Sequence, residues 1–393
     1  MMQHTAVQPH VDWPERFNAV PKDIFYREDV YRSELERIFY GPEWHPIAHR
    51  AELPKPGDFK TAYVGEASLL IVHGMDGQLR VFMNSCPHRG TTLKTEHRGS
   101  CDLIVCPYHR WTFTPQGELR GAPGADDFPP DFRKEDFGLR RLRSDEVFGL
   151  LFVTFSADTA PLREYLGDTI PYIGKVLGDD GRLTLIGYQK VIFDCNWKLY
   201  NDNEGYHGPL LHTAFQLLQF RSGEGTQFMT ANAHKVNCTT LPPVKDTGVL
   251  QDFSIIEARD PKRPAAASIV TLFPLAQMVK QLDVINVRHA HPLSPNRTEV
   301  HYTYFAHQDD DPALAQHRIR QASNLLGPSG FISLEDGAVF NRMQLGSATG
   351  GTTNYVKGAR GPLSGPCVLD KGDEAGNLVR WARYRQVMGF DHA

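Results

Sequence analysis

The sequence predicts an α+β protein of two domains, with strand-forming segments in the first part of the chain and long helices in the second. A chain of 393 residues has room for about two domains of ~150 residues each, and 41% of its residues are hydrophobic, so sizeable cores can form. Short apolar runs between Gly- and Pro-rich turns come first, and helical patterns gather later. Strands followed by long helices are typical of α+β domains.

The first two segments differ in their hydrophobic pattern. Residues 1–42 are expected to form an arm and a helix, because apolar residues cluster on one side of residues 29–40 and a Gly-Pro pair stops the helix. Residues 43–156 hold the strands. Within them, the runs 67–73 and 79–83 are expected to pair as a hairpin, since a Gly-Met-Asp-Gly turn separates them.

Polar and small residues mark a boundary, after which residues 157–393 are expected to form the second domain. Residues 282–289 and 298–306 alternate in polarity and are expected to pair as strands. Two helices are expected at 312–326 and 331–343, separated by a Gly-Pro-Ser-Gly stretch.

Composition excludes several classes of protein. The formal net charge of −4 argues against a nucleic-acid binder, because such proteins neutralise phosphates with Lys and Arg. No apolar run approaches the ~18 residues of a membrane span, and the first residues lack the basic and apolar regions of a secretory signal. The six cysteines show no disulfide framework, so a cytoplasmic protein is expected.

Four potential metal ligands lie between residues 84 and 113. Cys86 and His88 form C-x-H, and seventeen residues later Cys106 and His109 form C-x-x-H. Zinc fingers usually take both cysteines from one arm and both histidines from the other, whereas here each arm supplies one of each. This pattern suits a [2Fe–2S] cluster with one iron on the two cysteines and the other on the two histidines, which is the Rieske arrangement.

This stretch resembles the Rieske motif of ring-hydroxylating oxygenases, including the proline that follows each cysteine. The resemblance extends from about residue 43 to the end of the chain and is closest to the terephthalate- and salicylate-type oxygenases. It implies a Rieske [2Fe–2S] β-sandwich joined to a helix-grip (Bet v1-like) catalytic domain, assembled as a trimer. One departure is Arg110, where the family has Gly or another small residue; it concerns the outer contacts of the loop and not the ligands.

A second candidate metal site begins with His207 and His212. On an uninterrupted helix these residues would lie ~140° apart, so they could share a metal only if the helix bends. Gly208 and Pro209 lie between them, and a proline is a common cause of such a bend. By itself, this pair is better explained by structural or solvent-facing histidines.

The third ligand is a distant carboxylate. Two histidines and one carboxylate form the facial triad of non-haem Fe(II) oxygenases. Asp336 and Glu335 are equally good ligands by chemistry, and spacing alone favours an ordinary helix residue. The choice of Asp336 follows from the resemblance, in which the E-D-G-A-V run supplies the aspartate of the triad.

The resemblance also implies a carboxylate that bridges a cluster histidine to a triad histidine of a neighbouring subunit. It lies three residues before the first triad histidine, which here is Glu204. The family more often has Asp, and the segment 197–207 is two residues shorter than the family pattern. Asp202 therefore remains a rival for the bridge.

Clues to the substrate are few. Arg288 matches a position at which terephthalate-type enzymes bind the substrate carboxylate, and a guanidinium suits two-pronged carboxylate binding. A surface or intersubunit arginine is an equally good interpretation. Leu210, Phe215, Leu217 and Leu218 are candidates for an apolar pocket near the iron, although such residues are more often simply part of the core.

Together these features imply the α subunit of an oxygenase that uses O2 to dihydroxylate or hydroxylate an aromatic substrate, expected to be a carboxylate from aromatic catabolism. Electrons from NAD(P)H would arrive through a separate reductase, with or without a ferredoxin, because no G-x-G-x-x-G motif follows a strand. A homotrimer is expected, with or without a small β subunit (α3β3). The alternatives are a monooxygenase or N-demethylase of quaternary amines, a non-catalytic Rieske electron carrier, and a helix-grip protein that has lost its iron.

Overall fold

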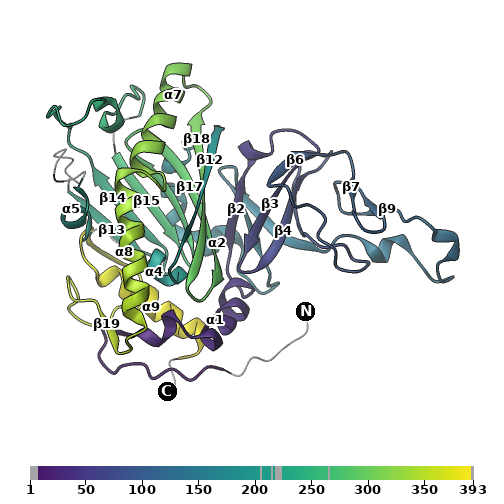
Figure 1. Ribbon diagram of the computed structural model, residues 1–393, viewed down its shortest axis with the longest axis horizontal. Helices are drawn as coiled ribbons and strands as arrows, with labels where there is room; N and C mark the ends of the chain where they lie inside the picture. The colour runs from purple at the N-terminus through teal and green to yellow at the C-terminus, as the bar shows by residue number, and fades with distance from the viewer. Residues whose placement is uncertain (1–7, 204–205, 214–215, 217–223, 264–265, 391–393) are drawn as a thin grey trace. The chain divides into compact units, whose positions relative to one another are not determined.

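The computed structural model describes residues 8–203, 206–213, 216, 224–263 and 266–390, and it divides into two compact units (Figure 1). The β unit spans Tyr40–Leu162, and the mixed unit combines the chain up to Phe39 with the chain from Arg163 onward. The N-terminal segment, which the sequence suggested as a separate arm, is therefore part of the mixed unit.

The β unit is built from antiparallel strands. One sheet of seven has the order β2-β11-β10-β5-β4-β3-β6, and a smaller one has the order β7-β8-β9. The expected hairpin is confirmed: β4 pairs with β5, and His73 lies opposite Leu79. The strands of the β unit are β2 (His45–His49), β3 (Asp58–Val64), β4 (Ala67–His73), β5 (Leu79–Met83), β6 (Arg98–Ser100), β7 (Ile104–Val105), β8 (Thr112–Phe113), β9 (Leu119–Gly121), β10 (Arg141–Val147) and β11 (Leu150–Thr154).

The mixed unit contains an eight-stranded antiparallel sheet with the order β12-β18-β17-β16-β15-β14-β13-β20. The expected pairing of two alternating segments is confirmed, although β17 and β18 are longer than predicted and turn more tightly. The strands are β12 (Leu183–Phe193), β13 (Gly225–Met229), β14 (Lys235–Thr240), β15 (Ala266–Leu272), β16 (Ala276–Gln281), β17 (Val284–Ser294), β18 (Arg297–His307) and β20 (Cys367–Asp370), while β1 (Ala19–Pro21) pairs separately with β19 (Thr352–Asn354).

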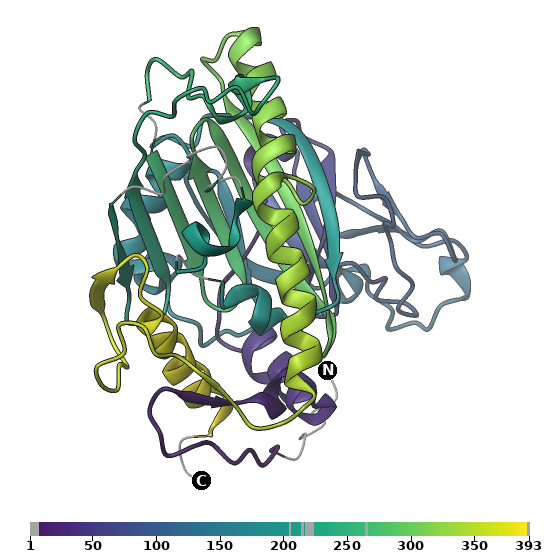
Figure 2. The same ribbon diagram turned by 60° about the vertical axis from the view of Figure 1, so that its left-hand side comes forward.

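The long helix α8 lies across one face of this sheet (Figure 2). It runs four residues beyond the expected end, and α7 before it begins with Pro312 behind the capping side chain of Asp311. The helix expected at 29–40 is α1 followed by a π-helical turn, Leu35–Phe39. The α-helices are α1 (Glu28–Glu34), α2 (Leu162–Leu166), α3 (Ile170–Val176), α4 (Trp197–Asn201), α5 (Gly208–Leu211), α7 (Pro312–Gln321), α8 (Phe331–Ser347) and α9 (Ala375–Met388).

A buried carboxylate ties the N-terminal segment into the mixed unit. Glu34 on α1 accepts hydrogen bonds from Lys198 Nζ (2.5 Å) and Trp197 Nε1 (2.8 Å) on α4, and from the Tyr384 hydroxyl (2.5 Å) on α9. Glu34 is fully buried and Lys198 is 3% exposed. Removing one partner of a buried ion pair leaves an uncompensated charge and typically costs ~3–5 kcal/mol. This pair therefore holds α4, and with it the start of the segment that carries His207.

Another buried group of the mixed unit is kept neutral. His234 Nδ1 accepts a hydrogen bond from the Phe273 backbone N–H (3.1 Å), and its Nε2 lies 3.2 Å from the Tyr165 carbonyl oxygen. The ring thus carries its proton on Nε2. Burial lowers the pKa of His234 to about 3, since no water reaches the ring to solvate a charge.

Candidate metal centres and cavity

Two loops of the β unit have the same backbone hydrogen bonds. In the first, Cys86 N–H donates to the Thr91 carbonyl (2.9 Å), and Gly90 N–H donates back to the Cys86 carbonyl (2.9 Å). The second loop repeats both bonds, at 2.8 and 3.2 Å, starting from Cys106. Each loop thus presents one cysteine and one histidine in the same way, which agrees with the paired spacing of the motif.

The four side chains of these loops converge. Cys86 and Cys106 are each 2% exposed, and the ring centroids of His88 and His109 lie 4.7 Å apart. The His88 ring stacks on Trp111 with an interplanar angle of 6°. His109 Nδ1 is buried and has no hydrogen-bond partner within the described ranges. Two buried thiols and two imidazoles, one with an unsatisfied nitrogen, fit a [2Fe–2S] cluster of the Rieske type.

The repeated loop explains the unusual residue after His109. Gly90 and Arg110 occupy the same loop position, and both have left-handed backbone conformations, with φ of 76° and 61°. Glycine adopts this conformation freely, whereas a residue with a Cβ pays roughly 1–2 kcal/mol. Arg110 therefore strains the backbone of the second loop.

In the mixed unit, His207 and His212 flank a single turn of helix. His207 lies directly before α5 and His212 directly after it. Their ring centroids are 5.2 Å apart. Gly208 and Pro209 were expected to bend a longer helix, but they form the first turn of the short helix α5, where a proline is tolerated.

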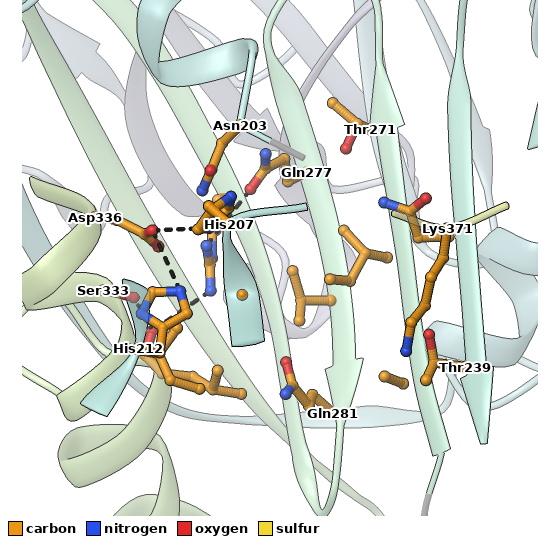
Figure 3. Close-up of a pocket in the computed structure, with 18 of the residues that line it drawn as sticks. Asn203, His207, His212, Thr239, Thr271, Gln277, Gln281, Ser333, Asp336 and Lys371 are labelled. Atoms are coloured by element: carbon orange, nitrogen blue, oxygen red, sulfur yellow. Dashed lines mark hydrogen bonds and ion pairs between the residues drawn. The ribbon is translucent and has the colours of Figure 1, made fainter. Parts of the chain in front are cut away.

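Asp336 on α8 reaches between these histidines (Figure 3). Its Oδ1 lies 3.2 Å from His207 Nε2 and 3.5 Å from His212 Nε2, and the three ligand atoms are within 4.8 Å of one another. This oxygen is buried and accepts no hydrogen bond from the residues described. Glu335 turns to the other side, where its Oε2 lies 3.1 Å from His212 Nδ1 and accepts the Thr213 N–H (3.0 Å).

This arrangement separates the roles of the two neighbouring carboxylates. A carboxylate on Nδ1 holds that nitrogen protonated, so Nε2 is the nitrogen of His212 that can bind a metal. The unsatisfied Oδ1 of Asp336 and two convergent Nε2 atoms form the donor set of a non-haem Fe(II) site. The residues present therefore fit a mononuclear iron.

A cavity of about 170 Å³ opens beside this group (Figure 3). Arg288 on β17 lines it, and its guanidinium lies 3.5 Å from Gln277 Oε1, 3.3 Å from Asn286 Oδ1 and 5.0 Å from the centre of the Tyr302 ring. No ion pair joins Arg288 to a carboxylate in the described part of the chain. The other lining residues include Asn203, Asn237, Thr239, Leu241, Ile269, Thr271, Val279, Gln281, Leu326, Ile332, Ser333 and Lys371.

Two protein-family models match this chain, one within the β unit and one within the mixed unit. Residues 43–133 match the Rieske [2Fe-2S] domain, and residues 180–366 match the ring hydroxylating alpha subunit (catalytic domain). The large subunit of anthranilate 1,2-dioxygenase from Burkholderia cepacia is 32% identical, over 97% of this chain and 95% of that protein. The large oxygenase component of salicylate 5-hydroxylase from a Ralstonia species is 31% identical, over 85% of this chain and 86% of that protein.

This chain belongs to the Rieske ring-hydroxylating oxygenases, as an α subunit. Naphthalene 1,2-dioxygenase from a Rhodococcus species, solved with indole bound, has the same fold, with a TM-score of 0.82 and 24% identity over 95% of both chains. The β unit is thus the Rieske domain and the mixed unit the catalytic domain. The non-catalytic electron carrier is excluded as an alternative, because the matched catalytic domain would have no part in a carrier.

Members of this oxygenase family carry a Rieske [2Fe–2S] cluster and a non-haem iron, use O2, and act on small aromatic substrates with electrons from a reductase or ferredoxin. Among the helices of the described residues, none has the length and apolar character needed to cross a membrane.

The structure describes only some of the residues that the sequence suggested for the bridge and the pocket. Glu204, Phe215, Leu217 and Leu218 lie outside the described residues. Leu210, a candidate for the pocket or the core, is 62% exposed and absent from the cavity wall, so it belongs to neither. A one-turn helix has a solvent side, and Leu210 occupies it.

Asp202, the rival for the bridging carboxylate, has partners within the catalytic domain. Its carboxylate accepts a hydrogen bond from the Tyr355 hydroxyl, and its carbonyl accepts one from Asn377 Nδ2 (2.9 Å). These contacts support a structural role for Asp202 at the end of α4.

The polar wall of the cavity was not found in the sequence. Gln277 and Gln281 on β16, Thr239 on β14 and Lys371 after β20 come from separate strands that the sheet brings together. Burial lowers the pKa of Lys371. No sequence signal marks such residues, since each is an ordinary polar residue of a half-buried strand or turn.

Proposed function

We propose that this oxygenase hydroxylates the ring of an aromatic carboxylate and that Arg288 binds the carboxylate group. The observation that carries the proposal is a guanidinium in the wall of the cavity beside the His207, His212 and Asp336 side chains, with no ion pair to a carboxylate among the described residues. The two relatives named above are anthranilate and salicylate enzymes, whose names both denote aromatic acids.

Electrostatics favours an anionic substrate. The neighbours of Arg288 are amide and carbonyl oxygens and an aromatic face, which satisfy some of its N–H groups but do not neutralise its charge. Buried charges are normally paired, and a planar carboxylate offers a guanidinium two parallel hydrogen bonds. A quaternary ammonium group would instead bring a further positive charge into a cavity that Arg288 and Lys371 already line, which argues against the N-demethylase alternative.

The proposed roles in catalysis follow from these contacts. When bound, iron on His207, His212 and Asp336 would activate O2, and the cluster held by the two Cys–His loops would supply single electrons. Glu335 keeps the His212 ring in the tautomer whose Nε2 faces the metal. Arg288 holds the substrate by its carboxylate, so the ring lies in the cavity beside the iron ligands, and the bound substrate displaces water from that space.

The remaining features belong to the same proposal. Glu204 is proposed as the carboxylate that connects the cluster of one subunit to the iron of the next. This requires an oligomer, proposed as a homotrimer with or without a β subunit. The electron donor is proposed to be a separate reductase with or without a ferredoxin, and the location to be the cytoplasm.

The test is product analysis under 18O2 with the purified protein, a generic reductase and NADH. The substrates would be benzoates with hydroxyl, amino or second carboxyl substituents, each compared with its neutral amide, and carnitine-like amines. Ring products from the acids alone, with one or two labelled oxygens, would support the proposal and separate hydroxylation from dihydroxylation. Turnover of the amines, or equal turnover of acids and amides, would contradict it.

A further inference from the structure

A second group of two histidines and a carboxylate lies elsewhere in the catalytic domain. His291 is on β17, and Glu299 and His301 are on β18. The Nε2 atoms of His291 and His301 lie 3.2 and 2.5 Å from the same oxygen, Oε1 of Glu299. The three candidate ligand atoms are within 4.8 Å of one another, which is the spacing also met by the iron ligands.

We propose that His291, Glu299 and His301 bind one divalent first-row transition metal ion, of the Zn²⁺ or Co²⁺ type, at a site separate from the mononuclear iron. Two neutral imidazoles and one carboxylate oxygen form a three-ligand set that such ions accept in proteins, with water completing the coordination.

The strand register presents these ligands on one face of the sheet. His291 lies directly opposite Glu299, and His301 follows two residues later on β18, so all three side chains project from the same face. Arg288 and Tyr302, which also lie opposite each other, project from the other face, the one beside the cavity. The proposed site is thus on the far side of the strands that carry the substrate arginine. Because these strands belong to the middle of a sheet, the ligands are held in place before any ion binds.

Lys190 on β12 forms an ion pair with the other oxygen of the Glu299 carboxylate. Its Nζ lies 3.0 Å from Glu299 Oε2, which leaves Oε1 for the ion that the two imidazoles face. A carboxylate that binds a metal through one oxygen commonly has its second oxygen held by a hydrogen bond. His291 and Glu299 are buried and His301 is half-buried, so His301 is the ligand nearest to an entry path.

Without a metal, the same atoms can form a plain hydrogen-bonded network, in which both imidazoles donate to Oε1. The two arrangements differ in one measurable respect, since only the first takes up one ion per chain. A bound ion would join β17 to β18 and stabilise the folded catalytic domain by mass action.

The experiment uses the full-length chain with its cluster loaded and with His207→Ala and His212→Ala, so that the iron site cannot bind the probe. Co²⁺ is titrated and followed by visible absorption, by bound cobalt per chain, and by the thermal unfolding temperature, with Zn²⁺ as competitor. We expect one equivalent of Co²⁺ that Zn²⁺ displaces, together with a higher unfolding temperature.

The variants His301→Ala and Glu299→Gln, added to this background, are expected to weaken binding by at least about 100-fold, as loss of one of three ligands should. His10→Ala, which removes an exposed histidine paired only with Asp12, is the matched control and should bind as the parent does. If Glu299→Gln does not fold, Co²⁺ binding by the His301→Ala variant tests the proposal, because His301 is only half-buried. Absence of a bound equivalent, or unchanged binding in His301→Ala, would overturn the proposal and leave the hydrogen-bonded network.

Discussion

Replacing Arg288 by methionine removes the proposed carboxylate ligand while keeping a side chain of similar length and shape. A hydrogen bond to a charged group contributes roughly 1.5–3 kcal/mol, and a carboxylate can take two from one guanidinium. Part of this gain offsets the desolvation of the carboxylate, so a net loss of about 3 kcal/mol is expected for an acid substrate. That corresponds to a drop in kcat/KM of about 150-fold.

The assay compares two substrates in three proteins. A neutral amide of the same ring cannot use the charge, so its kcat/KM should change less than about three-fold in Arg288→Met. Arg288→Lys keeps the charge and loses the two-pronged geometry, and an intermediate loss of about ten-fold is expected for the acid. The visible spectrum of the cluster and the iron content per chain serve as folding controls.

Two results would refute this reasoning about Arg288. An equal loss for acid and amide would mean that the arginine supports the cavity wall, through its contacts with Gln277 and Asn286, and does not recognise the substrate charge. An acid that keeps its full kcat/KM in Arg288→Met would place the carboxylate elsewhere, for example at Lys371 in the same cavity.

Other perturbations test separate parts of the protein. His207→Ala should remove the mononuclear iron and product formation while the visible spectrum of the cluster remains, and retained turnover would refute the assignment of the iron ligands. Glu204→Gln should reduce turnover with both metal centres loaded; if Asp202→Asn does so instead, the bridge is Asp202. Arg110→Gly should stabilise the Rieske domain by ~0.5–1 kcal/mol, since relief of ~1–2 kcal/mol of left-handed strain outweighs the entropy of glycine, ~0.5–1 kcal/mol. Thermal unfolding of the two proteins checks this change in stability. Because folding lowers the pKa of His234 to about 3, the unfolded chain binds the extra proton below its ordinary pKa of 6.5. The stability from this residue is therefore complete above pH 6.5 and is lost as the pH falls, by about 2 kcal/mol at pH 5 relative to pH 7; urea titrations at both values should show this loss, and His234→Gln should reduce it.

The candidate cluster could be predicted from sequence because its ligands are local. Cys86 and His88 lie on one short loop and Cys106 and His109 on another, so spacing alone defines the donor set. The strand pairs were also predictable, because alternating polarity reports which face of a strand is buried. The histidines of the second site were visible in the same way, but Asp336 lies more than a hundred residues away, and only the family resemblance distinguished it from Glu335.

Residues that come from distant parts of the sequence and meet only in the folded domain could not be predicted in this way. Lys371 and Gln281 reach the cavity because β20 and β16 belong to one sheet, and neither position is unusual in sequence. Glu34 is of a residue type that is rarely buried, yet it lies in the core with Lys198. A buried charge is explained only by its partner, and that partner is 164 residues away.

The contact of Glu34 with distant residues has a consequence for biosynthesis. Its partners lie 164 and 350 residues later in the chain, so the core of the catalytic domain cannot close until the last helix has left the ribosome. The Rieske domain is continuous in sequence and is complete at Leu162. At ~5–20 residues per second, roughly 10–45 s pass between the synthesis of Leu162 and that of Tyr384, the partner of Glu34 on α9. The Rieske domain can thus acquire its cluster on the nascent chain, before α9 is available to bury the carboxylate of Glu34.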